Sequence, residues 1–246
     1  MNFELEAGYV SRDLTHFVGR GKPEEEQYEL LLKIVRSGWL THPPHKPTPG
    51  SSLTVNPNVK LSDNEMYTPR MVCFCDIPVQ NLGIHIRKYS RFGLAFPKDF
   101  IAQRGGMPVR YIPRSAKRGA ARIGSSDNAE NMGAYFDRMV RSYYQVFILA
   151  DRLPQALGQS PDREEDSSLL TDLRFFFNFQ VFSFLKFFDH TLPDTHPESY
   201  YLEREWRVLG NVSFSMGDIV RIIVPAAYKE RLRSALSEYC GEIHSI

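Results

Sequence analysis

The sequence predicts an α+β fold with a mixed, mainly antiparallel sheet. Strand-like segments and short helices alternate irregularly over roughly the first hundred residues, two long apolar helical segments follow, and strand-like segments return near the C-terminus. A doubly wound parallel sheet would instead alternate strands and helices throughout. We therefore expect one domain over residues 1–246, with a helical insertion at about residues 127–190.

The first elements are an extended segment and an amphipathic helix. Residues 9–18 indicate an opening strand. Pro23 suits the first turn of a helix, and the three glutamates that follow suit its positive end. Apolar residues then recur at helical spacing as far as Trp39, and Gly38 is a natural helix end. Residues 41–57, rich in Pro, Ser and Thr, predict a long loop.

The middle of the chain reads as short strands separated by turns and helices. Three strands are expected, at residues 70–77, 92–96 and 108–112. Between them, Pro78 opens a short helix that runs through Tyr89, and Pro97 begins a helical turn that ends at Gly105-Gly106. Residues 114–128 form a basic loop rich in Gly, Ser and Ala, which could contact nucleic acid or simply be solvated.

Two long helices and a closing strand–helix pair make up the rest. One apolar stripe predicts a helix over residues 132–150, followed by a polar loop at 155–168. Residues 169–188 predict a second helix that is apolar on most sides and so deeply buried. After the strand around Glu205, a further strand is expected at 218–224 and an amphipathic helix at 225–239.

The most informative segment is the strand-like stretch around Glu205. Alternation on a strand would place Glu203, Glu205 and Arg207 on one face and Trp206 on the other. Such a face is either a solvated surface with weak ion pairs or the floor of a polar cleft. We interpret it as a cleft, in which Glu205 is the catalytic candidate and Glu203 the alternative. If both are buried, either one of them is held partly protonated or Arg207 neutralises the pair.

Further candidate binding residues lie earlier in the chain. His16 stands on the opening strand, where its ring could hold a ribose hydroxyl or be satisfied by backbone. His85 belongs to a cationic segment with Tyr89 and Ser90 that is either a phosphate-binding corner or an exposed helix end.

Composition narrows the classes of function. A net charge of +1 gives no general electrostatic case for nucleic acid or membrane binding. The cysteine pair Cys73 and Cys75 lacks a second pair at metal spacing, so no metal site is expected. Residues 1–10 carry acids and no apolar run, and no apolar stretch of about 20 residues occurs, so we expect a cytoplasmic protein without a membrane span.

Several short segments, in order along most of the chain, together resemble one family. They are Leu14-Thr15-His16-Phe17, Leu31 to Leu40, Met71-Val72-Cys73-Phe74-Cys75-Asp76-Ile77-Pro78, His85 with Tyr89-Ser90-Arg91-Phe92-Gly93-Leu94-Ala95-Phe96, Pro108-Val109-Arg110-Tyr111, and Glu203-Arg204-Glu205-Trp206-Arg207. With them the chain resembles the AbiGi family of abortive-infection proteins. The resemblance implies phage defence and the antitoxin role in a two-gene toxin–antitoxin system.

The same positions bear a more distant likeness to ADP-ribosyltransferase-like enzymes. That likeness implies NAD as a substrate, with His16 on the nicotinamide ribose, Glu205 stabilising the cationic sugar, and Tyr89 or Ser90 in the middle position. Two main hypotheses therefore stand, beside the plainer possibility of a degenerate enzyme fold used as a sensor. The first is an NAD-dependent ADP-ribosyltransferase that modifies nucleic acid or protein, with His16 and Glu205 meeting across one pocket. The second is a non-catalytic antitoxin or regulator that binds a toxin or nucleic acid through residues 41–57 and 114–128.

Overall fold

A computed structural model describes residues 11–43, 45–117, 130–157, 163–193, 196 and 199–246. Its contacts divide the chain into two compact units. The first takes the described residues of Met1–Ser52, Arg70–Val109 and Leu202–Ile246, and the second those of Leu53–Pro69 and Arg110–Tyr201. The predicted helical insertion falls within the second unit, together with segments on either side of it.

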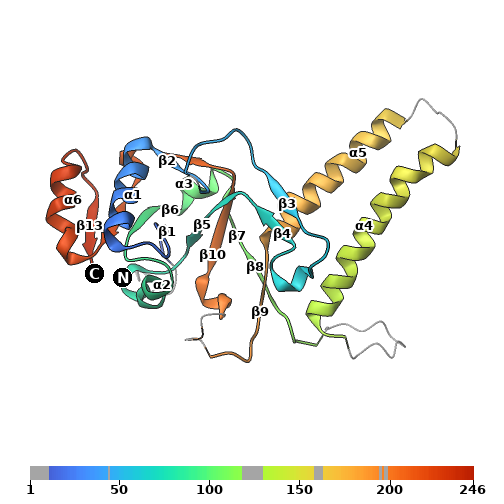
Figure 1. The fold of residues 1–246 in the computed structure, drawn as a ribbon, viewed down its shortest axis with the longest axis horizontal. Coiled ribbons are helices and arrows are strands. Elements are labelled where there is room, and N and C mark those ends of the chain that lie inside the picture. The colour runs from blue at the N-terminus through green and yellow to red at the C-terminus, as the bar shows by residue number, and fades with distance from the viewer. Residues whose placement is uncertain (1–10, 44, 118–129, 158–162, 194–195, 197–198) are drawn as a thin grey trace, which may run out of the picture. The chain divides into compact units, whose positions relative to one another are not determined.

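The first unit is built on a seven-stranded sheet of order β13-β12-β6-β1-β5-β10-β7 (Figure 1). Neighbouring strands are antiparallel except for β12 and β13, which are parallel. The predicted α+β class with a mainly antiparallel sheet is thus confirmed. The strands are β1 Asp13–Phe17, β5 Met71–Cys75, β6 Gly93–Pro97, β7 Met107–Pro108, β10 Glu205–Leu209, β12 Arg221–Val224 and β13 Glu242–Ser245.

The register of the central strands decides which side chains share a face. Thr15 of β1 and Glu205 of β10 both pair with Cys75 of β5. Since directly paired residues point to the same side of a sheet and successive residues alternate, Cys75, Glu205 and Arg207 share one face. The neighbours Phe74 and Trp206, which also pair, lie on the other face.

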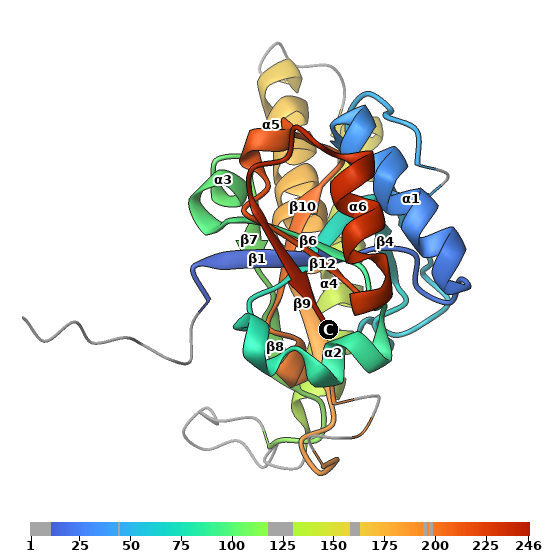
Figure 2. The same ribbon diagram turned by 90° about the vertical axis from the view of Figure 1, so that its left-hand side faces the viewer.

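One face carries the main apolar core. Helices α1 (Glu24–Ser37), α3 (Lys98–Ala102) and α6 (Lys229–Ala235) pack on it, and Figure 2 shows α1 and α6 side by side. The sheet contributes Leu14, Phe74, Phe96 and Ile222, and the helices contribute Tyr28, Leu31, Ile101 and Leu232. All of these side chains are almost fully buried. Each contributes about 1.5–3 kcal/mol by leaving water, so this face anchors the unit.

The opposite face is covered by α2 (Gly83–Lys88) and carries a smaller apolar cluster. Cys75, Leu82 and Ile223 are its buried members, with Phe17 and Ile86 packed against them. Because the apolar cluster is small, the face has room for the charged side chains of β10.

Helix α1 begins and ends where the sequence predicts. Pro23 precedes it, Glu24, Glu25 and Glu26 fill the first turn, and Gly38 caps its end in the left-handed conformation, with φ 67°. The Gly38 N–H donates to the Ile34 carbonyl oxygen at 3.1 Å. Directly after the cap, β2 (Trp39–Leu40) pairs with β11 (Val212–Ser213).

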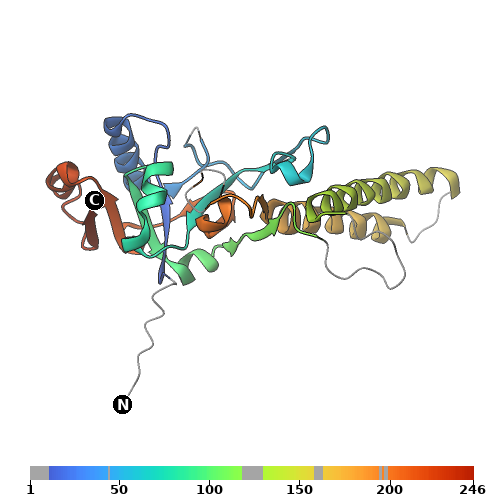
Figure 3. The same cartoon turned by 90° about the horizontal axis from the view of Figure 1, so that it is seen from below.

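The second unit combines a helical hairpin with two small sheets. Strands β3 (Leu53–Val55) and β4 (Tyr67–Pro69) pair antiparallel, and β8 (Arg110–Pro113) and β9 (Leu185–Phe188) pair in parallel. Helices α4 (Met132–Leu157) and α5 (Arg163–Phe175) lie side by side in Figure 3, and the chain then continues as a π-helical turn over Phe176–Val181. Its core includes Leu61, Met66, Ile112, Val140 and Phe187.

The predictions for residues 155–188 were wrong in length and in burial. Helix α4 continues to Leu157, α5 already begins at Arg163, and residues 185–188 form β9 rather than the end of a helix. Leu169, Phe175 and Phe176 are 58%, 54% and 51% exposed. Apolar composition predicts burial only if another layer covers the helix, and among the described residues no such layer covers these side chains.

The C-terminal elements also differ from expectation. The predicted helix over 225–239 is shorter, because α6 spans Lys229–Ala235, and β13 was not predicted. Strand β13 is short and half-exposed at the edge of the sheet, so it lacks the alternation of a half-buried strand.

We predict that Gly38→Ala destabilises the first unit far more than Gly21→Ala. Both glycines have positive φ, but a Cβ at Gly38 would meet the Phe214 carbonyl oxygen at 2.7 Å, whereas nothing lies within 4 Å of one at Gly21. We expect about 3 kcal/mol for Gly38→Ala and about 1 kcal/mol for Gly21→Ala. Urea unfolding followed by tryptophan fluorescence measures this, since both tryptophans lie in the first unit. Equal losses for the two variants would contradict the packing of Gly38 against Phe214.

Candidate functional site

Glu205 and Arg207 form a buried ion pair on the face of the sheet that α2 covers. Both lie on β10, and their side chains are only 9% and 8% exposed. Arg207 Nε donates to Glu205 Oε1 at 2.8 Å, and Nη2 donates to Oε2 at 3.2 Å. This two-point contact uses both carboxylate oxygens and is the strong form of an Arg–carboxylate pair. Arg207 therefore neutralises Glu205, which is one of the two alternatives that the sequence left open.

Glu203 reaches the same face by a different backbone route. It ends a short 3-10 turn, Tyr200–Glu203, and β10 begins only at Glu205, so the predicted strand start was wrong. Arg204 between them has φ 42°, which breaks the alternation of a strand. The Glu203 carboxylate is nevertheless buried and accepts hydrogen bonds from Lys88 Nζ at 2.7 Å and from the Tyr89 hydroxyl.

His85 and Tyr89 come from α2 and its C-terminal end, and they stack with Phe17 of β1. The ring centroid of Phe17 lies 6.4 Å from that of His85 and 6.0 Å from that of Tyr89. His85 is buried, and its Nδ1 has no hydrogen-bond partner among the described residues. Burial lowers the pKa of His85, and burial together with the charge of Glu203 raises the pKa of Tyr89. Both rings are therefore neutral near pH 7.

We call these residues the α2-facing cluster: His85, Lys88, Tyr89, Glu203, Glu205 and Arg207. Its carboxylates, Glu203 and Glu205, are matched by its cations, Lys88 and Arg207. Buried charges are tolerated when they are paired and hydrogen-bonded in this way. The cluster is thus electrically complete without a ligand, and a substrate would have to displace one of these contacts.

Ser90 lies next to Tyr89 in sequence but contacts a different element. Its hydroxyl donates to Gln27 Oε1 of α1 at 2.8 Å, and the Phe92 N–H donates to Ser90 Oγ at 2.9 Å. These bonds hold α1 to the chain between α2 and β6. The structure therefore groups Tyr89, and not Ser90, with the glutamates.

His16 lies on the opposite face of the sheet from Glu205. It follows Thr15, which pairs with Cys75 as Glu205 does, so alternation turns its ring to the side of Phe74. The His16 and Phe74 ring centroids are 5.7 Å apart, and His16 Nδ1 lies 2.8 Å from the Cys73 carbonyl oxygen. Burial lowers the pKa of His16. The sequence suggests that His16 and Glu205 meet across one pocket, but the register places them on opposite faces of the sheet.

The second unit presents an exposed apolar surface that the sequence did not predict. We call it the hairpin face: it comprises Val146, Ile148 and Leu149 of α4, and Leu169, Leu173, Phe175 and Phe176 of α5 and its continuation. Their exposed fractions lie between 39% and 58%. The helices hold each other through other residues, since Arg174 lies over the Phe147 ring and Tyr143 packs on Phe177. The signal was present in the apolar run at 169–188, which we had assigned to the core.

The remaining expectations concern nucleic acid, metal and membrane. Residues 118–129 of the basic loop, with Arg118 and Arg122, lie outside the described residues. Within the described part of the chain, no group of three or more His, Cys, Asp or Glu side chains could hold a metal ion. We also find, in that part, no helix with the length and apolar character needed to span a bilayer. NAD binding and the catalytic roles of Glu205 and Glu203 stay predictions.

Comparison with known proteins gives a family match over most of the chain. Residues 57–236 match the family described as "Putative abortive phage resistance protein AbiGi, antitoxin". A relative from Lactococcus lactis subsp. cremoris, described as "Abortive phage resistance protein AbiGi", is 37% identical over 76 residues. That alignment covers 27% of this chain and 30% of the relative. No solved structure matches the chain, so the likeness to ADP-ribosyltransferases has no structural support.

We predict that Arg207→Met costs about 3–5 kcal/mol of stability, because it leaves the buried Glu205 carboxylate without its cation. Arg91→Met is the matched control, since Arg91 pairs with Glu24 at 2.8 Å but both side chains are nearly half exposed. An exposed pair is worth less than about 1 kcal/mol. Urea unfolding of the two variants measures the difference. A loss for Arg207→Met no greater than that for Arg91→Met would show that the α2-facing cluster is not a buried network.

Proposed function

The chain belongs to the AbiGi family of abortive phage resistance proteins, and from this premise we propose that it is an antitoxin that restrains a protein toxin by binding it. The observation that carries the proposal is the family match over residues 57–236, whose description names an antitoxin. The match includes the complete hairpin face and the complete α2-facing cluster. An antitoxin of this kind needs a surface for its partner more than it needs a reactive site.

The hairpin face supplies such a surface. Large exposed apolar groups on a folded chain are candidate sites for another molecule, because leaving them in water is unfavourable. Phe175 and Phe176 are large aromatic side chains of the kind that anchor protein interfaces. A partner bound to these side chains would also explain why residues 169–176 are apolar although the sides of the helix are exposed to solvent.

The α2-facing cluster supports binding over catalysis. Each of its carboxylates already accepts hydrogen bonds from a cation of the same unit. His16, which the transferase hypothesis needs beside Glu205, lies on the other face of the sheet. ADP-ribosyl transfer from NAD is therefore the second hypothesis, and its test is separate from that of binding.

We predict that Leu169→Glu weakens binding to the toxin at least about tenfold, because it places a charge in the apolar interface. Leu169 is 58% exposed, so the variant should fold. The probe is a tagged protein whose gene lies next to that of this chain and whose expression alone stops host growth; it is co-expressed with this chain, with co-purification and host growth as readouts. Ala134→Glu, an exposed position near the start of α4, is the control for the added charge.

The outcomes of this experiment distinguish a wrong interface from a wrong function. If the wild-type chain neither binds the toxin nor restores growth, the antitoxin proposal fails. If it does both and Leu169→Glu matches it, the hairpin face is not the interface. Loss with Leu169→Glu but not with Ala134→Glu is the expected result.

We also predict that the purified chain leaves NAD intact, with and without the toxin. The physical reason is that Glu205 is held by Arg207 and separated by the sheet from His16. Released nicotinamide measures turnover, and Glu205→Gln is the comparison, with circular dichroism to check its fold. Turnover by the wild-type chain that Glu205→Gln abolishes would overturn this prediction and restore the transferase hypothesis.

A further inference from the structure

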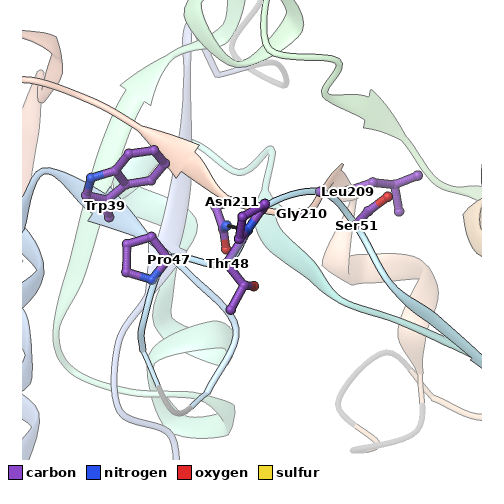
Figure 4. Close-up of a pocket in the computed structure, with 9 residues that line it drawn as sticks. Trp39, Pro47, Thr48, Ser51, Leu209, Gly210 and Asn211 are labelled. Carbon is purple, nitrogen blue, oxygen red and sulfur yellow. Dashed lines mark hydrogen bonds between the residues drawn. The ribbon is translucent and has the colours of Figure 1, made fainter.

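The first unit contains a surface groove away from the α2-facing cluster. It has a volume of about 530 Å³ and lies between Trp39, the loop at residues 47–51 and the turn at 209–211. Figure 4 shows Trp39 beside Pro47 at one end, and Leu209 and Ser51 at the other. This volume is within the usual range of about 300–1,000 Å³ for ligand sites.

Hydrogen bonds fix both walls of the groove. The Thr48 hydroxyl accepts from Arg70 Nη1 at 2.9 Å, and the Thr48 carbonyl oxygen accepts from Asn211 Nδ2 at 2.6 Å. The Gly210 N–H donates to the carbonyl oxygen of Arg70, the residue before β5, at 2.8 Å, which ties the turn to the start of that strand. Trp39 is held by β2, whose residues pair with those of β11. The groove is thus preformed, which lowers the entropic cost of binding.

Among the residues that line the groove, Trp39 offers a ligand the largest apolar contact surface. Its side chain is large and apolar, yet the residue is 38% exposed. No described residue accepts a hydrogen bond from the indole N–H. An exposed indole therefore offers both a flat apolar ring and a free donor, the combination that makes tryptophan effective at interfaces.

The lining selects the class of ligand. None of the residues that line the groove is charged. Proteins bind single-stranded nucleic acid with cationic side chains along its backbone and aromatic rings against its bases. The groove has no cationic side chain to contact phosphates, so it does not suit this ligand. The indole of Trp39, the aromatic ring among the lining residues, with its free N–H donor instead suits a polyproline II segment, whose proline rings pack on aromatics and whose carbonyl oxygens accept hydrogen bonds.

We propose that this groove binds an extended, uncharged, proline-containing segment of the toxin, with Trp39 as the anchor. That the segment belongs to a toxin rests on the proposed function. That it is extended, uncharged and contains proline rests on the groove alone. One wall of the groove, residues 47–51, belongs to the segment 41–57 that the sequence suggests as a partner-binding loop.

Overlapping peptides that cover the toxin sequence provide the test. Trp206→Phe leaves Trp39 as the single tryptophan, so its fluorescence reports occupancy directly. We expect one uncharged, proline-containing peptide to shift the Trp39 emission to shorter wavelength. In competition assays, Trp39→Ala should weaken that peptide at least about tenfold, and Trp39→Phe, which keeps a ring but loses the N–H, should weaken it less.

Met107→Ala is the matched control, because Met107 lies in the same unit and is 37% exposed. It should bind the peptide as the wild-type chain does. The groove proposal is overturned if no toxin peptide binds, if Trp39→Ala binds as tightly as wild type, or if single-stranded RNA competes for Trp39. A toxin that binds the intact chain while its peptides leave Trp39 unchanged rejects the groove and retains the antitoxin. If the intact toxin does not bind at all, the proposed function itself fails.

Discussion

The pairing of β5 with β1 on one side and β10 on the other is the constraint on which the rest of the first unit depends. Cys75 is the common partner of Thr15 and Glu205, so a single register fixes the direction of every side chain on three strands. A slip by one residue would exchange the two faces. Phe74, which is almost fully buried under α1 and α3, makes that exchange very costly.

This register gives the two faces different chemistry. The face under α1, α3 and α6 is apolar and supplies most of the stability. The face under α2 contains buried, mutually neutralised charges, which add specificity to the arrangement of β10 and α2 more than they add stability. The same register separates His16 from Glu205, and so it bears directly on what the unit can do chemically.

Local sequence was enough to predict the elements whose signals are local. Helix α1 has its proline start, its acidic first turn and its glycine end within one segment, and β5 and β6 are short apolar runs between turns. The placement of Glu205 and Arg207 on one face was also predicted, although the strand was expected to begin before Glu203. No local sequence pattern predicts the positive φ of Arg204, which changes the direction of the chain between the two glutamates.

What the sequence could not predict depends on residues far apart in the chain. The donors to Glu203 come from Lys88 and Tyr89, more than a hundred residues away, and the groove needs Trp39, Thr48 and Gly210 to converge. The apolar run at 169–176 was taken for core because composition does not show which layer will cover a helix. If the chain works by binding, as we propose, a partner provides that layer.

The central claim is that this protein acts by contact through its exposed apolar surfaces. Hydrogen–deuterium exchange of the chain with and without the toxin tests this claim most directly. We expect the toxin to slow exchange at amides of α4 and α5 around Leu149 and Leu169 and at those around Trp39, with β5 and β10 unchanged. Protection confined to α2 and β10, next to Glu203 and Glu205, would contradict the account, because it would place the functional site at the charged cluster.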